Sequence, residues 1–416
     1  LGMRPVVYSC LDAATKNAGW VRGGSDISYY SNSYSRNNTA GEGVACYYTL
    51  SFTVEFQHAK DTTLIAYSYP YTYSDYKAHL SQILNRSNAS DIIRCTRLCH
   101  TLSGEDCDLL VITNFKAKDK DRIGPINLGS AESYRSDEAQ RRQGGTMGRP
   151  SNPSCKDSTH TLKPAVFLSC RVHPGETPAS WMMKGALDFL TSDCPQAQIL
   201  RQSFVVFVVP MLNPDGVIYG NNRCSLAGVD LNRQWKIPMK GLHPTVFHLK
   251  SLMAAQRRLR EILCYVDLHG HSRKYNVFMY GCDEKKKSRP QVRIFPRLFS
   301  MHHIGKKYVC YGDCSFHVRK GRESTARVVV AREMNIPCSY TLEATFCGSN
   351  YGPLKHCHMH VGHLQETGAA LCDTILNFSI SEGKVQDALL VPVNVKATAE
   401  METSIGEEDG VSASGQ

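Results

Sequence analysis

Apolar and polar positions alternate in the first part of the chain. Residues 45–56 carry an apolar side chain at every second position, and residues 63–73 continue as a β-branched and tyrosine-rich stretch. A period of two is typical of strands with one buried face. No long helical pattern precedes residue 76, and residues 109–112 form a last apolar run. We therefore predict a small, all-β domain over residues 1–115.

Later in the chain the pattern changes to buried strands that alternate with helices. Residues 165–172 and 204–209 are apolar enough for strands that are buried on both faces. Between them, Thr177 is a suitable N-cap and Pro178 suits the first helical position. The apolar stripe that follows, as far as residue 190, has helical spacing.

The same alternation continues downstream. It predicts helices at 246–263 and 365–378, and strands at 264–268, 277–280 and 338–342. Strands that alternate with helices favour an α/β fold, in which helices cover a mixed, mostly parallel sheet. We expect this second domain to span residues 164–382.

Two polar segments border the α/β domain. Residues 116–163 contain few large apolar side chains, so we predict a flexible insertion or linker there. Residues 383–416 are similarly depleted and become acidic at 407–409, which predicts a disordered tail.

Composition narrows the class of protein. The chain has 416 residues, 42% hydrophobic and 21% charged, which suits two globular domains. It has no apolar stretch of the ~20 residues that a membrane helix needs, so we expect no membrane insertion. The net charge of +10 favours acidic partners. The basic residues are dispersed and no nucleic-acid-binding module is recognisable, so we expect no nucleic acid as partner.

The 17 cysteines lack the short spacing of a disulfide-rich secreted domain. We therefore expect reduced thiols in a cytoplasmic protein. The chain starts at Leu1 without an apolar leader, which indicates that the natural protein begins further upstream.

A candidate metal site is the most informative motif. His173-Pro174-Gly175-Glu176 offers an imidazole and a carboxylate from a turn, and His269 offers a second imidazole after an apolar run. Catalytic zinc sites keep three protein ligands and leave one position for water, whereas structural sites close with four. We therefore predict one Zn²⁺ per chain, held by His173, Glu176 and His269. His271, two positions further on, is an alternative ligand.

The placement of these residues supports a common site. His173, His269 and Glu343 each follow a predicted strand. In open α/β sheets the ligand crevice lies beyond the carboxyl ends of the strands, so the three side chains can converge despite their separation in sequence. Taken singly, each of them would be read as an ordinary polar surface residue.

The chain resembles the cytosolic carboxypeptidases, a branch of the zinc metallocarboxypeptidases whose characterised members remove glutamates from tubulin tails. The similarity extends from the first residues of the chain to the final helix. It rests on several blocks in one order: Tyr69-Pro70-Tyr71-Thr72-Tyr73, His173-Pro174-Gly175-Glu176-Thr177, residues 210–217, residues 230–235, His269-Gly270-His271-Ser272 and residues 340–346. For the domain at residues 1–115 the resemblance implies a β-sandwich-like fold.

The resemblance implies roles for individual residues. His173, Glu176 and His269 match the family's zinc ligands, and Glu343 matches its catalytic glutamate, which transfers a proton from water to the leaving amine. By the same resemblance Arg223 stabilises the oxyanion. Asn232 and Arg233 hold the terminal carboxylate of the substrate, for which the planar fork of arginine is suited.

Selection of a glutamate side chain requires a cation in the pocket. Arg327 lies 16 residues before Glu343, near the position at which the wider superfamily places its side-chain-selecting residue. Lys320, Arg322 and Arg332 are alternatives. The mobile tyrosine of secreted relatives has no assigned equivalent, since Tyr311, Tyr340 and Tyr351 all remain candidates.

A second histidine-rich segment is another candidate metal site. In His356-Cys357-His358-Met359-His360 the histidines alternate and could bind metal on one strand face. The segment lies beyond the catalytic strand and lacks a second set of partners, so we interpret it as a surface loop.

The sequence therefore predicts a zinc-dependent carboxypeptidase that releases carboxy-terminal glutamate from acidic protein tails, with tubulin or other proteins with glutamate-rich tails as partners. We expect it in the cytosol, associated with microtubules. Two alternatives stay open: a non-catalytic microtubule-binding module of the same fold, and a zinc carboxypeptidase with a different side-chain specificity.

Overall fold

The computed structural model describes residues 3–36, 45–116, 120–126, 162–283 and 289–385. Most of the expected insertion at 116–163 and nearly all of the expected tail at 383–416 lie outside these ranges. No helix within them combines the length and the apolar character needed to cross a membrane.

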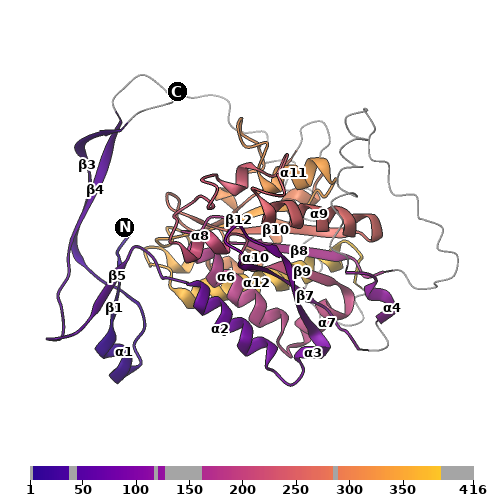
Figure 1. The fold of residues 1–416 in the computed structure, drawn as a ribbon, viewed down its shortest axis with the longest axis horizontal. Coiled ribbons are helices and arrows are strands. Elements are labelled where there is room, and N and C mark those ends of the chain that lie inside the picture. The colour runs from indigo at the N-terminus through magenta and orange to yellow at the C-terminus, as the bar shows by residue number, and fades with distance from the viewer. Residues whose placement is uncertain (1–2, 37–44, 117–119, 127–161, 284–288, 386–416) are drawn as a thin grey trace.

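A seven-stranded sheet forms the centre of the molecule (Figure 1). Its order is β11-β12-β10-β8-β9-β7-β6, and the four strands β12, β10, β8 and β9 run parallel. The remaining strands pair antiparallel at the two edges. The bounds are β6 Ile93–His100, β7 Asp106–Ile112, β8 Ala165–Cys170, β9 Val205–Val209, β10 Ile262–His271, β11 Val277–Tyr280 and β12 Ser339–Thr345. The predicted mixed α/β sheet is confirmed.

Helices cover both faces of this sheet (Figure 1). One face packs against α2 (Tyr73–Leu84), α6 (Thr177–Leu190), α7 (Pro195–Ser203), α10 (Gln291–Met301) and α12 (Val361–Ser381). The other packs against α9 (Pro244–Leu259) and α11 (Ala326–Glu333). Successive strand residues belong to opposite clusters, as Val166 and Phe167 do in β8, because side chains alternate across a strand.

Short elements complete this region. They are α3 (Ala89–Ile92), α4 (Lys120–Ile123), α8 (Pro214–Ile218) and the 3₁₀ turns η2 (Leu231–Arg233), η3 (Gly305–Lys307), η4 (Tyr311–Asp313) and η5 (Gly352–Leu354).

The amino-terminal region contains smaller antiparallel sheets, as predicted. The strand β1 (Val6–Ser9), which α1 (Cys10–Lys16) follows, pairs with β2 (Val21–Arg22) and β5 (Thr63–Ala66). A separate ribbon pairs β3 (Ser25–Arg36) with β4 (Ala45–Thr53).

One apolar run of the predicted amino-terminal domain belongs to the large sheet. Residues 109–112 form part of β7, which together with β6 extends that sheet. An antiparallel edge strand has the same sequence pattern whichever sheet it joins, so the pattern alone could not decide. The predicted division into domains stays a prediction.

Element ends also differ from expectation in places. The tyrosine-rich stretch at 63–73 is a strand only as far as Ala66, because Thr72 and Asp75 form a capping box that begins α2. The first helix of the α/β region has Glu176, not Thr177, as its N-cap residue. The predicted helix 246–263 ends at Leu259, and its last apolar residues belong to β10.

Candidate active site

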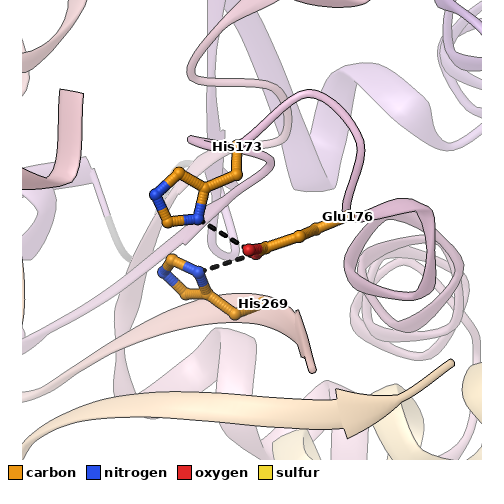
Figure 2. Close-up of side chains that lie close together, drawn as sticks. All are labelled: His173, Glu176 and His269. Atoms are coloured by element: carbon orange, nitrogen blue, oxygen red, sulfur yellow. Dashed lines mark hydrogen bonds and ion pairs between the residues drawn. The ribbon is translucent and has the colours of Figure 1, made fainter. Parts of the chain in front are cut away.

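Three predicted metal ligands converge at one edge of the sheet. His173 lies in the turn after β8, Glu176 at the start of α6, and His269 in β10. Nδ1 of His173 lies 2.8 Å from Oε1 of Glu176, and Nδ1 of His269 lies 2.8 Å from Oε2 of the same carboxylate. Figure 2 shows both rings directed at this carboxylate. One potential ligand atom from each residue lies within 4.8 Å of the others.

A further carboxylate contacts the Nε2 atom of each histidine. Nε2 of His173 lies 3.0 Å from Oδ1 of Asp230, and Nε2 of His269 lies 2.7 Å from Oδ2 of Asp267. Such a carboxylate sets the tautomer of a ligand histidine and leaves its other nitrogen free for the metal. Ser169 donates a hydrogen bond to the second oxygen of the fully buried Asp267.

We did not predict Asp230 and Asp267 from the sequence. Asp267 could have been found, because it lies two residues before His269 in a strand and therefore shares its face. Asp230 carried a weaker signal, since it belongs to the block that contains Asn232 and Arg233 but contacts a histidine from a different part of the chain.

The charges of the ligand set are strongly coupled. Burial lowers the pKa of His269, but Asp267 and Glu176 outweigh this effect and raise it well above its usual value. Burial raises the pKa of Glu176, but the two imidazoles lower it by more, so the net shift of this pKa is downward. Two inward-facing imidazole nitrogens and an ionised carboxylate are the donor set that zinc accepts in catalytic sites.

The alternative ligand His271 has another role in the structure. Its Nδ1 accepts hydrogen bonds from the backbone amides of Arg273, at 3.1 Å, and Lys274, at 2.9 Å. Its ring packs edge-on against Phe278, with the ring centroids 5.3 Å apart. It is not among the three residues that converge.

Glu343 lies beside the ligand set. It is the register partner of His269 in the parallel pair of β12 and β10. Its side chain is buried, and within the described part of the chain its Oε2 has no hydrogen-bond partner. Burial, with a contribution from the charge of Glu176, raises the pKa of Glu343 to about 7. A buried carboxyl with a raised pKa next to a candidate metal set is typical of a catalytic acid–base group.

Arg223, Asn232 and Arg233 surround Asp230. Nε and Nη2 of Arg223 donate to Oδ2 of Asp230 at 2.9 and 2.7 Å, and Nη1 lies 3.8 Å from Oε1 of Glu176. Nη2 of Arg233 lies 3.9 Å from the same Asp230 oxygen. Oδ1 of the buried Asn232 accepts a hydrogen bond from the backbone amide of Ala326, so η2 is attached to the start of α11.

Arg327 is buried at the start of α11. Its guanidinium stacks on Tyr280, 5.2 Å from the ring centre, and Nε donates to the carbonyl of Gly281 at 3.3 Å. The charges of Arg327 and Glu343 influence each other. The alternatives Lys320, Arg322 and Arg332 are exposed, so Arg327 is the one of the four that lies inside the fold next to Glu343.

Other histidine groups have structural contacts. Nδ1 of His302 accepts from the backbone amides of Ile304 and Gly305, both at 3.3 Å, so its proton lies on Nε2 and is donated to Asp373 at 2.8 Å. This arrangement disfavours the nearby group of His302, His303 and Asp373 as a metal site.

In the segment 356–360, His358 accepts from the amide of Arg4, and His360 caps α12 by accepting from the amide of Gly362. Tyr340, one of the tyrosines left without a role, is fully buried and donates to backbone carbonyls of α10.

Fold and site together have the features of the zinc carboxypeptidase class: a mixed sheet covered by helices holds a His-Glu-His set, a buried carboxyl with a raised pKa and a group of arginines. The chain belongs to the zinc carboxypeptidase family, whose model matches residues 81–356.

The chain is 42% identical to cytosolic carboxypeptidase 1 of Gallus gallus over 395 residues, which cover 90% of this chain and 29% of the relative. It is 40% identical to cytosolic carboxypeptidase 2 of Homo sapiens over 379 residues, 91% of this chain and 37% of the relative. The chain thus spans well under half the length of these curated relatives.

Solved structures support the fold. A metallo-carboxypeptidase from Burkholderia cenocepacia superposes with a TM-score of 0.63 at 20% identity, covering 91% of this chain and 81% of the other. A metallo-carboxypeptidase from Pseudomonas aeruginosa gives a TM-score of 0.61 at 18% identity, covering 92% and 81%.

Proposed function

We propose that this protein is a zinc-dependent carboxypeptidase that removes glutamate from the carboxy terminus of acidic protein tails. The observation that carries the proposal is Glu343, the register partner of His269, a buried carboxyl of which one oxygen has no hydrogen-bond partner among the described residues. A fold-maintaining surface carboxylate would not need this burial. A group that exchanges protons with water at the metal set does need it, because burial raises the pKa of the carboxyl toward neutral pH.

His173, Glu176 and His269 are the residues that would hold the zinc. When bound, the ion supplies an activated water molecule and polarises the scissile carbonyl. Asp230 and Asp267 keep the Nδ1 atoms of the two histidines directed at the site. Glu343 accepts the proton of the attacking water and donates it to the leaving amine.

Arginines supply the positive charge that the reaction needs. Arg223 is partly exposed, with Nη1 3.8 Å from Oε1 of Glu176, and it can stabilise negative charge that develops on the scissile carbonyl oxygen. Arg233, with Asn232, can bind the terminal carboxylate, which makes the enzyme an exopeptidase.

Arg327 supports the preference for glutamate. It is buried, its Nε donates to the carbonyl of Gly281, and its charge interacts with that of Glu343. A buried arginine attracts a carboxylate side chain much more strongly than an exposed one does. The positive net charge of +10 also favours an acidic substrate.

The relatives are named cytosolic carboxypeptidases, and on this basis we propose a cytosolic location. Tubulin, with its acidic tails, is the candidate partner, and association with microtubules is part of the same proposal.

The test is incubation of the purified, zinc-loaded protein with a peptide that ends in several glutamates, followed by mass spectrometry. We expect successive losses of one glutamate each, abolished by Glu343→Gln and unchanged by Glu105→Gln, which alters an exposed carboxylate. No loss with the wild-type protein, or undiminished loss with Glu343→Gln, would sink the proposal. Loss of the last residue from a matched peptide that ends in a neutral residue, without loss from the glutamate-ended peptide, would favour the alternative specificity.

A further inference from the structure

The segment at residues 67–71 lies against the turn that carries His173 and Glu176. It connects β5 to α2 and includes part of the tyrosine-rich block Tyr69–Tyr73, which the proposed mechanism does not use. Three alternate residues of the segment make contacts with the region that follows β8.

The first contact reaches the turn itself. The hydroxyl of Tyr67 donates a hydrogen bond to the carbonyl of Gly175, the residue before Glu176. On the opposite side, the amide of Gly175 donates to the carbonyl of Asn222 at 2.8 Å. A Cβ at position 175 would lie 2.5 Å from Oδ1 of Asn222, so only glycine fits between these two contacts.

The second contact involves Arg171, two residues before His173. Nε donates to the carbonyl of Pro174 at 2.7 Å, Nη1 to the hydroxyl of Ser180 at 2.7 Å, and Nη2 to the carbonyl of Tyr71 at 3.1 Å. One planar guanidinium therefore connects the turn, the helix α6 and the 67–71 segment.

Arg171 is unusual in two respects. Its side chain is buried, yet all three of these hydrogen bonds go to uncharged oxygens. Its backbone has φ 59°, in the left-handed region that residues with a Cβ rarely adopt. A buried cation and an unfavourable backbone conformation persist where the surrounding contacts hold them, and such positions cluster at functional sites.

The remaining contacts fix the segment from the other side. Nε1 of Trp181 donates to the carbonyl of Tyr69 at 3.3 Å, and the ring of Trp181 packs edge-on against Tyr71. Arg22, from β2, stacks on Tyr69 at 5.0 Å and donates to the carbonyl of Phe346, three residues after Glu343.

We propose that Arg171 and Tyr67 are positioning residues that hold the His173–Glu176 turn in its metal-binding conformation, so that zinc affinity depends on the 67–71 segment. Neither residue touches the ligand set directly in this role. Each acts through a backbone carbonyl of the turn, at Pro174 and Gly175. The inference rests on the zinc site of the proposed function but not on its substrate.

The test compares Tyr67→Phe and Arg171→Lys with the wild type and with the control Tyr29→Phe, which removes an exposed hydroxyl from the β3–β4 ribbon. Tyr67→Phe deletes one donor from a side chain that is 43% exposed, so the variant should fold. Lysine keeps the charge of Arg171 but cannot direct three hydrogen bonds in one plane. The readouts are the zinc dissociation constant from competition with a chelating dye, and kcat and KM on the glutamate-ended peptide.

We expect the zinc dissociation constant to rise about tenfold in Tyr67→Phe and more in Arg171→Lys, as for other residues that orient metal ligands. At limiting zinc kcat falls while KM stays constant, and excess zinc restores kcat, a rescue that general loss of structure would not allow. Tyr29→Phe should match the wild type.

An unchanged zinc dissociation constant in Tyr67→Phe overturns the inference, whether or not Arg171→Lys folds. A wild-type protein that binds no zinc sinks the proposed function itself. A wild-type protein that binds zinc but releases no glutamate sinks only the proposed activity, and the dissociation constants still test the positioning role.

Discussion

At the residue scale, the site depends on pairs of groups that change each other's charge. Glu343 is kept from ionising by burial and by the charge of Glu176, which raises its pKa to about 7. Glu176 is kept ionised by the two imidazoles. The two neighbouring carboxyls thus differ in pKa, and such a difference separates an acid–base group from a ligand.

The raised pKa of Glu343 predicts an acid limb in the pH dependence of activity. Only the ionised carboxylate accepts a proton from water, so kcat/KM should fall as pH decreases through the pKa of Glu343. The positive charge of a bound metal lowers that pKa, so the limb should lie at or below pH about 7. The measurement is kcat/KM between pH about 4 and 8. A rate that rises as the pH falls through this range would contradict the role of Glu343 as base.

The carboxylate behind His269 gives a second prediction. Asp267→Asn keeps the shape of the side chain but removes the charge that orients His269 and raises its basicity. We expect zinc affinity to fall by about 10- to 100-fold. Competition with a chelating dye measures it, with the exposed Asp91→Asn as control. Equal affinities in the two variants would show that Asp267 does not support the ligand.

At the element scale, strands and one close helix pair bring the site together. The parallel register of β10 and β12 sets Glu343 next to His269. The start of α6 presents Glu176, and α6 packs against α12 through two glycines. A Cβ on Gly368 would lie 1.8 Å from the carbonyl of Met182, and one on Gly185 would lie 1.9 Å from the carbonyl of Gln365.

This close packing predicts the effect of a single methyl group. Gly368→Ala should force α6 and α12 apart and destabilise the protein by about 1–3 kcal/mol, as overpacking does. Denaturant unfolding followed by circular dichroism measures the change. The control is Gly19→Ala, where a Cβ meets no atom within 4 Å. If both variants unfold at the same denaturant concentration, the α6–α12 contact is looser than the structure shows.

At the scale of the whole molecule, the candidate site joins parts of the chain that are distant in sequence. Its ligands come from the turn after β8, the start of α6 and β10. The carboxylates of Asp230 and Asp267 support the two histidines, and the 67–71 segment contacts the turn through Tyr67. A metal that binds the three ligands only where the fold has brought them together must stabilise the folded state.

Zinc removal therefore should lower the thermal stability of the entire protein. Free zinc at about 100 times its dissociation constant stabilises by about 2.7 kcal/mol, and a chelator removes this contribution. Differential scanning calorimetry with chelator, and again after zinc is restored, measures the reversible shift in Tm. In His269→Ala, which lacks one ligand, the shift should be much smaller. A wild-type Tm that does not respond to zinc would contradict the metal site.

Much of this protein could be predicted from local sequence. The alternating strands and helices after residue 164 predicted the mixed sheet, because strand and helix periodicities are local properties. The turn residues Pro174 and Gly175 likewise placed His173 and Glu176 close together. His269 and Glu343 were expected at strand ends, and the structure has them inside β10 and β12 as register neighbours.

Other features were decided only by tertiary structure. Whether β6 and β7 extend the large sheet or close the first domain depends on which strand edge they meet, and this leaves no trace in their own pattern. Three further relations exist only through space: Asp230 contacts His173, Arg327 is the buried one of four basic candidates, and Arg171 connects the turn to Tyr71. Local sequence determined which chemical groups and elements this protein has, whereas burial and contact across the fold decided which of them act together, because both depend on neighbours that are remote in sequence.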